Sequence, residues 1–265
     1  VVTRLVFPLV KKSMSLKKVY IPSFLGYATH GLLDACPSYG TQLFWPFSNE
    51  RVTWNNISIV DPLFTIPILI LVGTAIKTRK RLFSFFAIGW AAFYLSLGFV
   101  QYERALSAAN ELAESRGHNA ERLTLKPSFG NLILWKSIYQ HEQTFYVDAI
   151  RTVQSSTVCL GESIKIFNYQ QHLPGLDKES QQAEDVERFR WFSQDYLGFD
   201  DEKNLVTDVR YSMLPNQIEP MWGLVIDDQR DINEHAIWWT GRDLDQSQLS
   251  LFKEMLSGKK CRNRA

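Results

Sequence analysis

The stretch from Ile59 to Val100 decides the fold. It reads IVDPLFTIPILILVGTAI (59–76), then KTRKR (77–81), then LFSFFAIGWAAFYLSLGFV (82–100). The last run is nineteen residues without a charge, long enough to span a hydrocarbon core of about 30 Å, and the first is eighteen residues with one charge, Asp61. Two apolar runs joined by a short basic loop predict a helical hairpin in a membrane. Two core helices of a soluble protein are the weaker interpretation.

A third, weaker apolar segment covers residues 19–36, with Asp34 as its only charge. Its pattern fits either a span or an amphipathic helix, and counting it gives about three transmembrane spans. Positive residues favour the cytoplasmic side. The lysines before this segment and the basic loop 77–81 therefore place the chain after Gln101 on the opposite face, the periplasmic side of a bacterial inner membrane.

The composition changes after Gln101. Residues 1–101 carry 10 basic and 3 acidic side chains, whereas residues 102–265 carry 19 and 25. We divide the chain into a membrane-embedded helical region (1–101), a linker helix (102–119) and an extramembrane domain (120–265). Short β-like runs occur at 122–126, 132–139, 144–153, 204–213 and 221–227, with a hairpin loop at 140–143 and a helix that ends at Phe192. The predicted class is α+β, with a small, mostly antiparallel outer domain.

Overall charge and cysteine content exclude several classes of protein. A net charge of +1 argues against a nucleic-acid-binding polycation, and 45% hydrophobic residues argue against a disordered chain. Cys36, Cys159 and Cys261 are widely spaced, which predicts neither a disulfide framework nor a C-x-x-C metal site. The sequence has no Gly-rich phosphate loop and no G-x-S-x-G motif, so neither nucleotide chemistry nor serine hydrolysis has support.

One pair of side chains, His30 and Asp34, has the residue types and the spacing of metal ligands. His30 and Asp34 are four residues apart, so on a helix they project from one face about a turn apart. An imidazole and a carboxylate in this arrangement can bind one divalent metal ion. A structural His–Asp hydrogen bond explains the same spacing equally well, and spacing alone leaves both interpretations open.

The residues around this pair resemble a known family. The chain contains THGLLD (29–34), YGTQLFWPFS (39–48) and DPLFTIP (61–67). Together these motifs resemble the YdjM-like family of inner-membrane proteins, described as metal-dependent hydrolases of the LexA-regulated type. NLILW (131–135) and RFRWF (188–192) look like that family's extramembrane region, so the resemblance is expected to cover most of the chain.

The resemblance implies a membrane-bound hydrolase with a divalent metal ion, zinc in the first instance, near the periplasmic surface. His30 and Asp34 match two of the family's ligands, and a phosphoester or lipid-like substrate is expected by analogy with zinc-dependent phospholipases. The family also carries an H-R-G-x-[ST]-H-S motif and a P-D-x-D motif upstream. Neither motif occurs here, so we expect that the chain lacks its N-terminal segment. With two ligands alone, we also expect it to lack catalytic activity.

Asp61 is a further candidate ligand with a stronger structural alternative. It precedes Pro62 at the start of an apolar run, the position of a helix N-cap, and that role is about twice as well supported as metal binding.

The remaining candidates have structural interpretations. His118, His141, His172 and His235 show no ligand spacing and are expected to be solvated loop residues. The tryptophans after residue 120 are expected in the core, while Trp45 and Trp54 suit anchoring at a membrane interface. The rival to the hydrolase is a non-catalytic inner-membrane protein that binds an envelope partner through its outer β domain.

Overall fold

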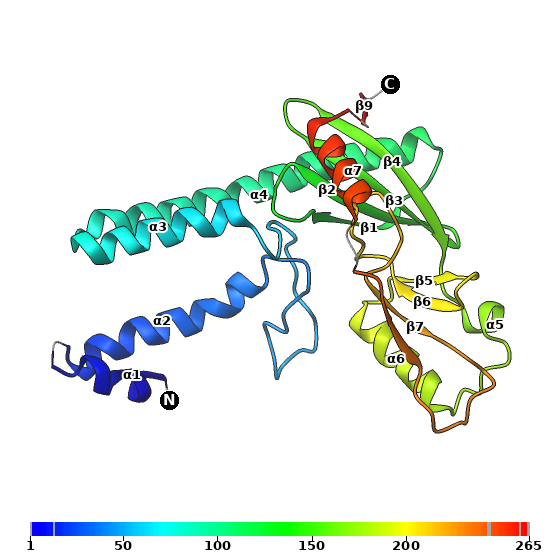
Figure 1. Cartoon of the computed structure of the whole chain (residues 1–265), viewed down its shortest axis with the longest axis horizontal. Coiled ribbons are helices and arrows are strands. Elements are labelled where there is room, and N and C mark those ends of the chain that lie inside the picture. The colour runs from blue at the N-terminus through cyan, green and yellow to red at the C-terminus, as the bar shows by residue number, and fades with distance from the viewer. Residues whose placement is uncertain (1, 13, 243–244, 260, 264–265) are drawn as a thin grey trace.

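The structure, a computed structural model, describes residues 2–12, 14–242, 245–259 and 261–263. The first part is helical: α1 (Val2–Val10), α2 (Leu16–Asp34), α3 (Pro62–Thr78) and α4 (Arg81–Ser115). Figure 1 shows these helices extending from a β-rich body, with the N-terminus at their far end. A helical part followed by antiparallel sheets confirms the predicted α+β class.

Helices α3 and α4 form the hairpin expected from the sequence. They pack against each other, and the chain turns between them at Arg79, which has a left-handed backbone. No side chain of α3 is buried. Large apolar side chains of both helices are instead exposed, among them Leu63, Ile66, Leu69, Ile70, Ile76, Phe85, Phe86, Ile88 and Phe93. A surface of this kind is typical of a membrane contact rather than of a soluble domain.

The prediction of about three spans was wrong by the criterion of length and composition. Among the described residues, one helix, α4, is both long and apolar enough to cross a membrane. Helix α3 is apolar but has 17 residues, because it begins at the cap Asp61 and ends at Thr78. Helix α2 has 19 residues but includes Lys17, Lys18 and Asp34, which reduce its hydrophobicity.

The second half of α4 belongs to the outer domain. Residues 102–115 continue the same 35-residue helix, so the predicted linker helix is not a separate element. Its small side chains Ala105, Ala108 and Ala109 are buried against Leu125 and Trp135 of the neighbouring sheet. The helix therefore connects the apolar hairpin directly to the outer domain without a hinge.

The outer domain contains two antiparallel sheets. The first has the order β1-β2-β3-β4-β9 and the second the order β5-β6-β7-β8. The bounds in the first sheet are β1 (Glu121–Pro127), β2 (Leu134–His141), β3 (Thr144–Thr152), β4 (Ser156–Lys165) and β9 (Arg262–Asn263). The predicted hairpin is confirmed, because His141 pairs with Thr144 across the turn between β2 and β3.

The second sheet is covered by a helix. Its strands are β5 (Leu197–Asp200), β6 (Leu205–Asp208), β7 (Trp222–Val225) and β8 (Ile237–Thr240). Helix α6 (Gln181–Phe192), preceded by the single turn α5 (Tyr169–His172), packs Val186 and Phe189 on Phe199, Val206 and Leu224. A bridge between Ile166 and Gly198 joins the two sheets.

Several elements of the outer domain were not predicted. They are β4, β5, β8, β9 and helix α7 (Gln246–Ser257). In β4, Gly161 interrupts the side-chain pattern that would indicate a strand. A Cβ atom at this position would lie 2.2 Å from the carbonyl oxygens of both Val147 and Asn216. Glycine is thus required by the close approach of two backbones.

The cysteine prediction was also wrong. Cys159 of β4 and Cys261 form a disulfide, while Cys36 is free and buried. The two bonded residues are 102 positions apart, so no spacing motif could reveal them. The disulfide fastens the end of the chain, with α7 and β9, to the first sheet.

Candidate metal centre

His30 and Asp34 lie together near the C-terminal end of α2, as the spacing predicts. The His30 Nε2 atom is 3.2 Å from the Asp34 Oδ2 atom, and the two side chains are 68% and 50% exposed. Both groups therefore remain open to a ligand from outside the helix. One imidazole nitrogen and one carboxylate oxygen are donors that zinc accepts, but a catalytic zinc site uses three protein ligands.

The structure does not add a third donor to this pair. Among the residues it describes, no group of three His, Cys, Asp or Glu side chains is arranged to hold a metal ion. The donor chemistry of His30 and Asp34 thus fits part of a zinc site.

Asp61 has the capping role that the sequence favoured. Its Oδ1 atom accepts hydrogen bonds from the backbone amides of Leu63 and Phe64, at 3.0 and 3.2 Å. Its Oδ2 atom accepts a 2.8 Å hydrogen bond from the Tyr94 hydroxyl of α4. The carboxylate is buried and holds the start of α3 against α4.

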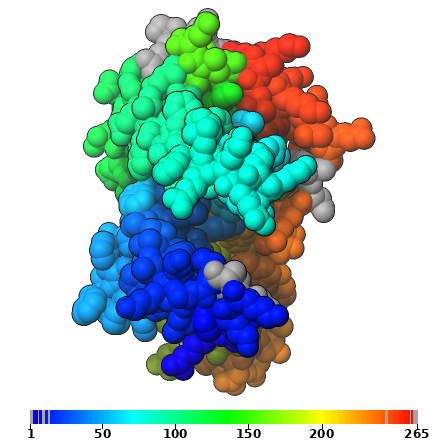
Figure 2. All heavy atoms as spheres, turned by 90° about the vertical axis from the view of Figure 1, so that its left-hand side faces the viewer, coloured from blue at the N-terminus to red at the C-terminus, as the bar shows by residue number. Residues whose placement is uncertain are grey.

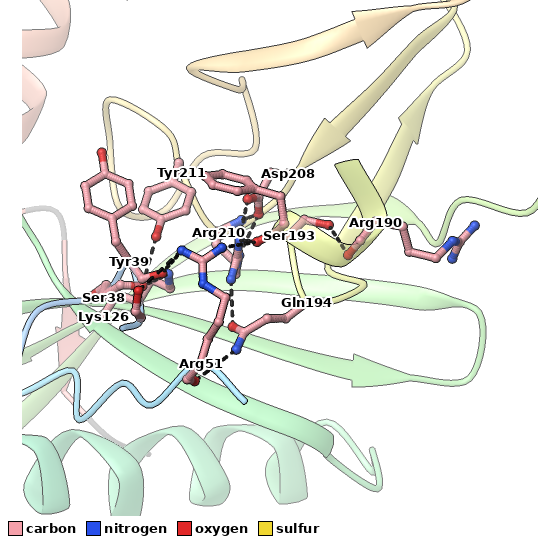
Figure 3. Close-up of polar contacts among 12 residues, drawn as sticks. Ser38, Tyr39, Arg51, Lys126, Arg190, Ser193, Gln194, Asp208, Arg210 and Tyr211 are labelled. Carbon is pink, nitrogen blue, oxygen red and sulfur yellow. Dashed lines mark hydrogen bonds and ion pairs between the residues drawn. The ribbon is translucent and has the colours of Figure 1, made fainter. Parts of the chain in front are cut away.

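The loop between α2 and α3, residues 35–61, is held against the outer domain by a polar cluster (Figure 3). At its centre, Arg210 donates to both carboxylate oxygens of Asp208, at 2.8 and 2.7 Å. Both residues are buried. Arg210 also donates to the Gln194 side chain and to the Phe192 carbonyl. An arginine with a bidentate carboxylate and further acceptors fixes the relative positions of the segments that it joins.

A buried lysine connects this centre to the loop. The Lys126 Nζ atom donates to the Ser38 carbonyl at 3.2 Å and lies 4.1 Å from the centroid of the Tyr211 ring. The Tyr211 hydroxyl donates to the same carbonyl at 2.9 Å. Burial, reinforced by the positive charge of Arg210, holds the pKa of Lys126 well below its usual range.

Arg51 completes the connection from the loop side. Its guanidinium donates to the Tyr39 carbonyl at 2.7 Å and to the Phe192 carbonyl at 3.4 Å. Loop 35–61 starts directly after Asp34, so this cluster fixes the chain that follows the candidate ligands. Sequence reasoning missed it, because its members come from four separate segments and no spacing relates them.

A second buried lysine lies close by on β2. The Lys136 Nζ atom donates to the Ser212 hydroxyl and to the Gln217 carbonyl, each at 2.7 Å. Burial lowers the pKa of Lys136 to about 7. Its neighbours belong to the outer domain alone, so it does not extend the candidate metal centre.

The other histidines have partners that their spacing did not reveal. His118 and His141 stack with ring centroids 4.3 Å apart, and the His118 Nδ1 atom is 2.9 Å from the Tyr139 hydroxyl. Desolvation, with His141 and Arg116 nearby, lowers the pKa of His118. In α6, Asp185 lies 2.8 Å from the Nδ1 atom of His235. His172 stacks on Phe199 at 4.7 Å.

The tryptophans of the outer domain divide between core and surface. Trp135 and Trp222 are buried, as predicted. Trp191 and Trp238 are each 55% exposed, so the prediction of core positions was wrong for these two. Trp238 packs edge-on against Phe189 of α6, which leaves its outer face uncovered.

Comparison with known proteins relates the helical part of the chain to a protein family. Residues 1–105 match the family model described as YdjM inner membrane protein. The match covers α1 to α3 and the first part of α4, including its whole apolar run 82–100, and it includes His30, Asp34 and Asp61. The predicted resemblance of segments 131–135 and 188–192 lies outside it. No curated protein and no solved structure matches the chain significantly. The resemblance to the YdjM-like family that the motifs predicted is therefore confirmed over residues 1–105.

Proposed function

We propose that the protein is a membrane-bound, metal-dependent hydrolase in which His30 and Asp34 provide two ligands to a divalent ion, zinc in the first instance. The observation that carries the proposal is their shared orientation, 3.2 Å apart and both exposed at the end of α2 nearest the outer domain (Figure 1). A bound divalent ion would supply the positive charge that acidifies a water molecule for attack on an ester.

The surroundings of the pair support a lipid-like substrate. Exposed apolar side chains flank it on α2, including Tyr27, Leu32 and Leu33. A substrate that reaches His30 and Asp34 would therefore contact both an apolar helix surface and two polar groups. This combination suits a phosphoester on a lipid-like molecule.

We further propose that the hairpin of α3 and the apolar half of α4 lies in the membrane and that the outer domain is periplasmic. Figure 1 shows the turn between α3 and α4 and the start of α2 at the end of the helices farthest from the outer domain. The basic residues Lys77 to Arg81, with Lys11, Lys12, Lys17 and Lys18, thus share one side. The Cys159–Cys261 disulfide lies in the outer domain, and disulfides persist in oxidising compartments such as the periplasm. It therefore supports a periplasmic location for the outer domain.

Fusions at two positions test this orientation. A fluorescent protein that matures only in the cytoplasm should be dark after Ala265 and bright when it replaces the chain after Thr78. Alkaline phosphatase, which is active only in the periplasm, should give the reverse pattern. A bright fluorescent fusion after Ala265 would reverse the proposed orientation.

A hydrolysis assay tests the chemistry. A protein that carries the family's upstream histidine and aspartate motifs as well as this chain, placed in phospholipid nanodiscs with zinc, should release a water-soluble phosphoester product, measured by mass spectrometry. His30→Ala and Asp34→Ala should each lower the rate at least about 100-fold, because loss of an outer-shell partner alone typically costs 10- to 100-fold. His118→Ala, in the outer domain, is the matched control. Equal rates for wild type and His30→Ala would contradict the assignment.

The second candidate is a non-catalytic membrane protein that binds an envelope partner through its outer domain. One observation favours it: β8 is the edge strand of its sheet, and its side chains Ile237 and Trp238 are about half exposed. Edge strands with apolar side chains pair readily with other chains. In that case His30 and Asp34 form a structural pair, and neither replacement changes metal content.

A further inference from the structure

The tip of loop 35–61 exposes an unusual number of aromatic side chains. Phe44, Trp45 and Phe47 are 56%, 67% and 94% exposed. Single exposed apolar residues are common on soluble proteins, but three within four consecutive positions form a continuous apolar surface. Such a surface requires a partner other than water.

The backbone of this tip is held in place. Thr41 and Val52 exchange two hydrogen bonds of 2.9 Å that close the base of the loop. Within it, the Phe44 carbonyl accepts from the amides of Phe47 and Ser48, at 2.9 and 3.2 Å. Arg51 ties the base to the outer domain. The aromatic side chains are therefore presented on a fixed turn and do not fold back onto the protein.

The position of the loop points to its partner. Loop 35–61 leaves α2 after Asp34 and enters α3 at Asp61, so both of its ends lie where the helices meet the outer domain (Figure 1). Viewed along the helices from their far end, the loop protrudes sideways beside α2 and is not covered by the helices (Figure 2).

A second segment exposes an aromatic side chain near the start of α3. Phe129, in the turn between β1 and β2, is 68% exposed. The next residue, Gly130, donates from its backbone to the Ser58 hydroxyl at 3.2 Å, just before α3 begins. Ile59 and Val60 beside it are also about half exposed. Two segments far apart in sequence thus present apolar groups where the helices enter the outer domain.

We propose that residues 42–48 and 128–131 together contact the lipid bilayer at the boundary between headgroups and acyl chains. Helix α3, which begins just after the contact between Ser58 and Gly130, and helix α4 also expose large apolar side chains, and residues 1–105 match a family of inner membrane proteins. Trp45 suits this layer because its indole combines an apolar ring with a polar N–H group, and phenylalanine side chains insert from the interface into the acyl-chain boundary. The contact fixes the outer domain against the membrane and requires no metal ion.

Spin labels on the protein in phospholipid nanodiscs test the proposal. Labels at Phe47→Cys and Phe129→Cys are compared with one at Ile88→Cys on the exposed surface of α4 and one at Asp201→Cys in the turn between β5 and β6. Cys36 is buried and Cys159 is bonded to Cys261, so the chain without a new cysteine measures background labelling. The measured quantity is the ratio of two collision rates of the spin label. One is its collision rate with oxygen, which concentrates in lipid, and the other is its collision rate with a water-soluble nickel complex.

The labels at positions 47 and 129 should give oxygen-to-nickel ratios between those of Ile88→Cys and Asp201→Cys, several-fold above the latter. A ratio at position 47 equal to that of Asp201→Cys would place the loop in water and overturn the proposal. Protection of position 47 from both reagents would also overturn it, because the loop would then be covered by protein.

Discussion

Replacing Asp208 with Asn is expected to lower the free energy of unfolding by about 3–5 kcal/mol. The substitution keeps the shape of the side chain but removes the carboxylate that holds Arg210, and both residues are buried. Arg210 would then be a buried charge without an ionic partner, with Lys126 close by. In thermal denaturation of the detergent-solubilised protein, the midpoint should fall by roughly 10 °C.

Glu184→Gln is the matched control for this experiment. Glu184 forms a 2.9 Å ion pair with Arg188 in α6, but both side chains are about two-thirds exposed. Exposed pairs of this kind contribute about 0–1 kcal/mol. The double variant Asp208→Leu/Arg210→Met should be less destabilised than the sum of its single replacements, because it leaves no buried charge unpaired. Equal midpoints for Asp208→Asn and Glu184→Gln would contradict the role given to the cluster.

Breaking the disulfide should have the second large effect. Cys159 and Cys261 enclose about one hundred residues, and closing a loop of that length stabilises a fold by about 4.7 kcal/mol in the chain-entropy account. Cys159→Ser should therefore lower the unfolding midpoint of the outer domain, and reductant should lower the wild-type midpoint to a similar value. Reductant should leave the midpoint of Cys159→Ser unchanged.

Thiol titration provides the direct check on that bond. The denatured protein, isolated without reductant from a bacterial inner membrane, should contain one reactive thiol, from Cys36, and three after reduction. Three thiols before reduction would show that the bond is absent and would remove its support for a periplasmic outer domain.

Local patterns predicted the parts of the fold that depend on local chemistry. The uncharged run from Leu82 to Val100 predicted the apolar half of α4, and Asp61-Pro62 predicted the start of α3. The alternation in 144–153 predicted β3. The second half of α4 was predicted only as a separate linker helix, because the composition changes at Gln101. It continues the apolar helix and is stabilised by packing Ala105, Ala108 and Ala109 on the sheet.

The candidate centre was predictable only as a local pair. Helical spacing brought His30 and Asp34 together, since residues four apart share a face. The contacts of Lys126, Arg51 and Arg210 depend on how the loop folds onto the outer domain. Their partners are up to 143 residues apart in the sequence, as for Arg51 and Gln194. Such contacts leave no periodicity in the sequence. The Cys159–Cys261 bond was missed for the same reason.

We propose above that His30 and Asp34 bind a metal ion. The most direct test is the zinc content of a protein that carries the family's upstream ligand motifs as well as this chain, loaded with zinc in detergent and then dialysed against zinc-free buffer. It is measured together with the midpoint of thermal unfolding. Wild type should retain zinc, and His30→Ala and Asp34→Ala should each lose it while unfolding within a few degrees of wild type, because both side chains are exposed. Unchanged zinc content with a large loss of stability would contradict the claim and would show that the two residues form a structural pair.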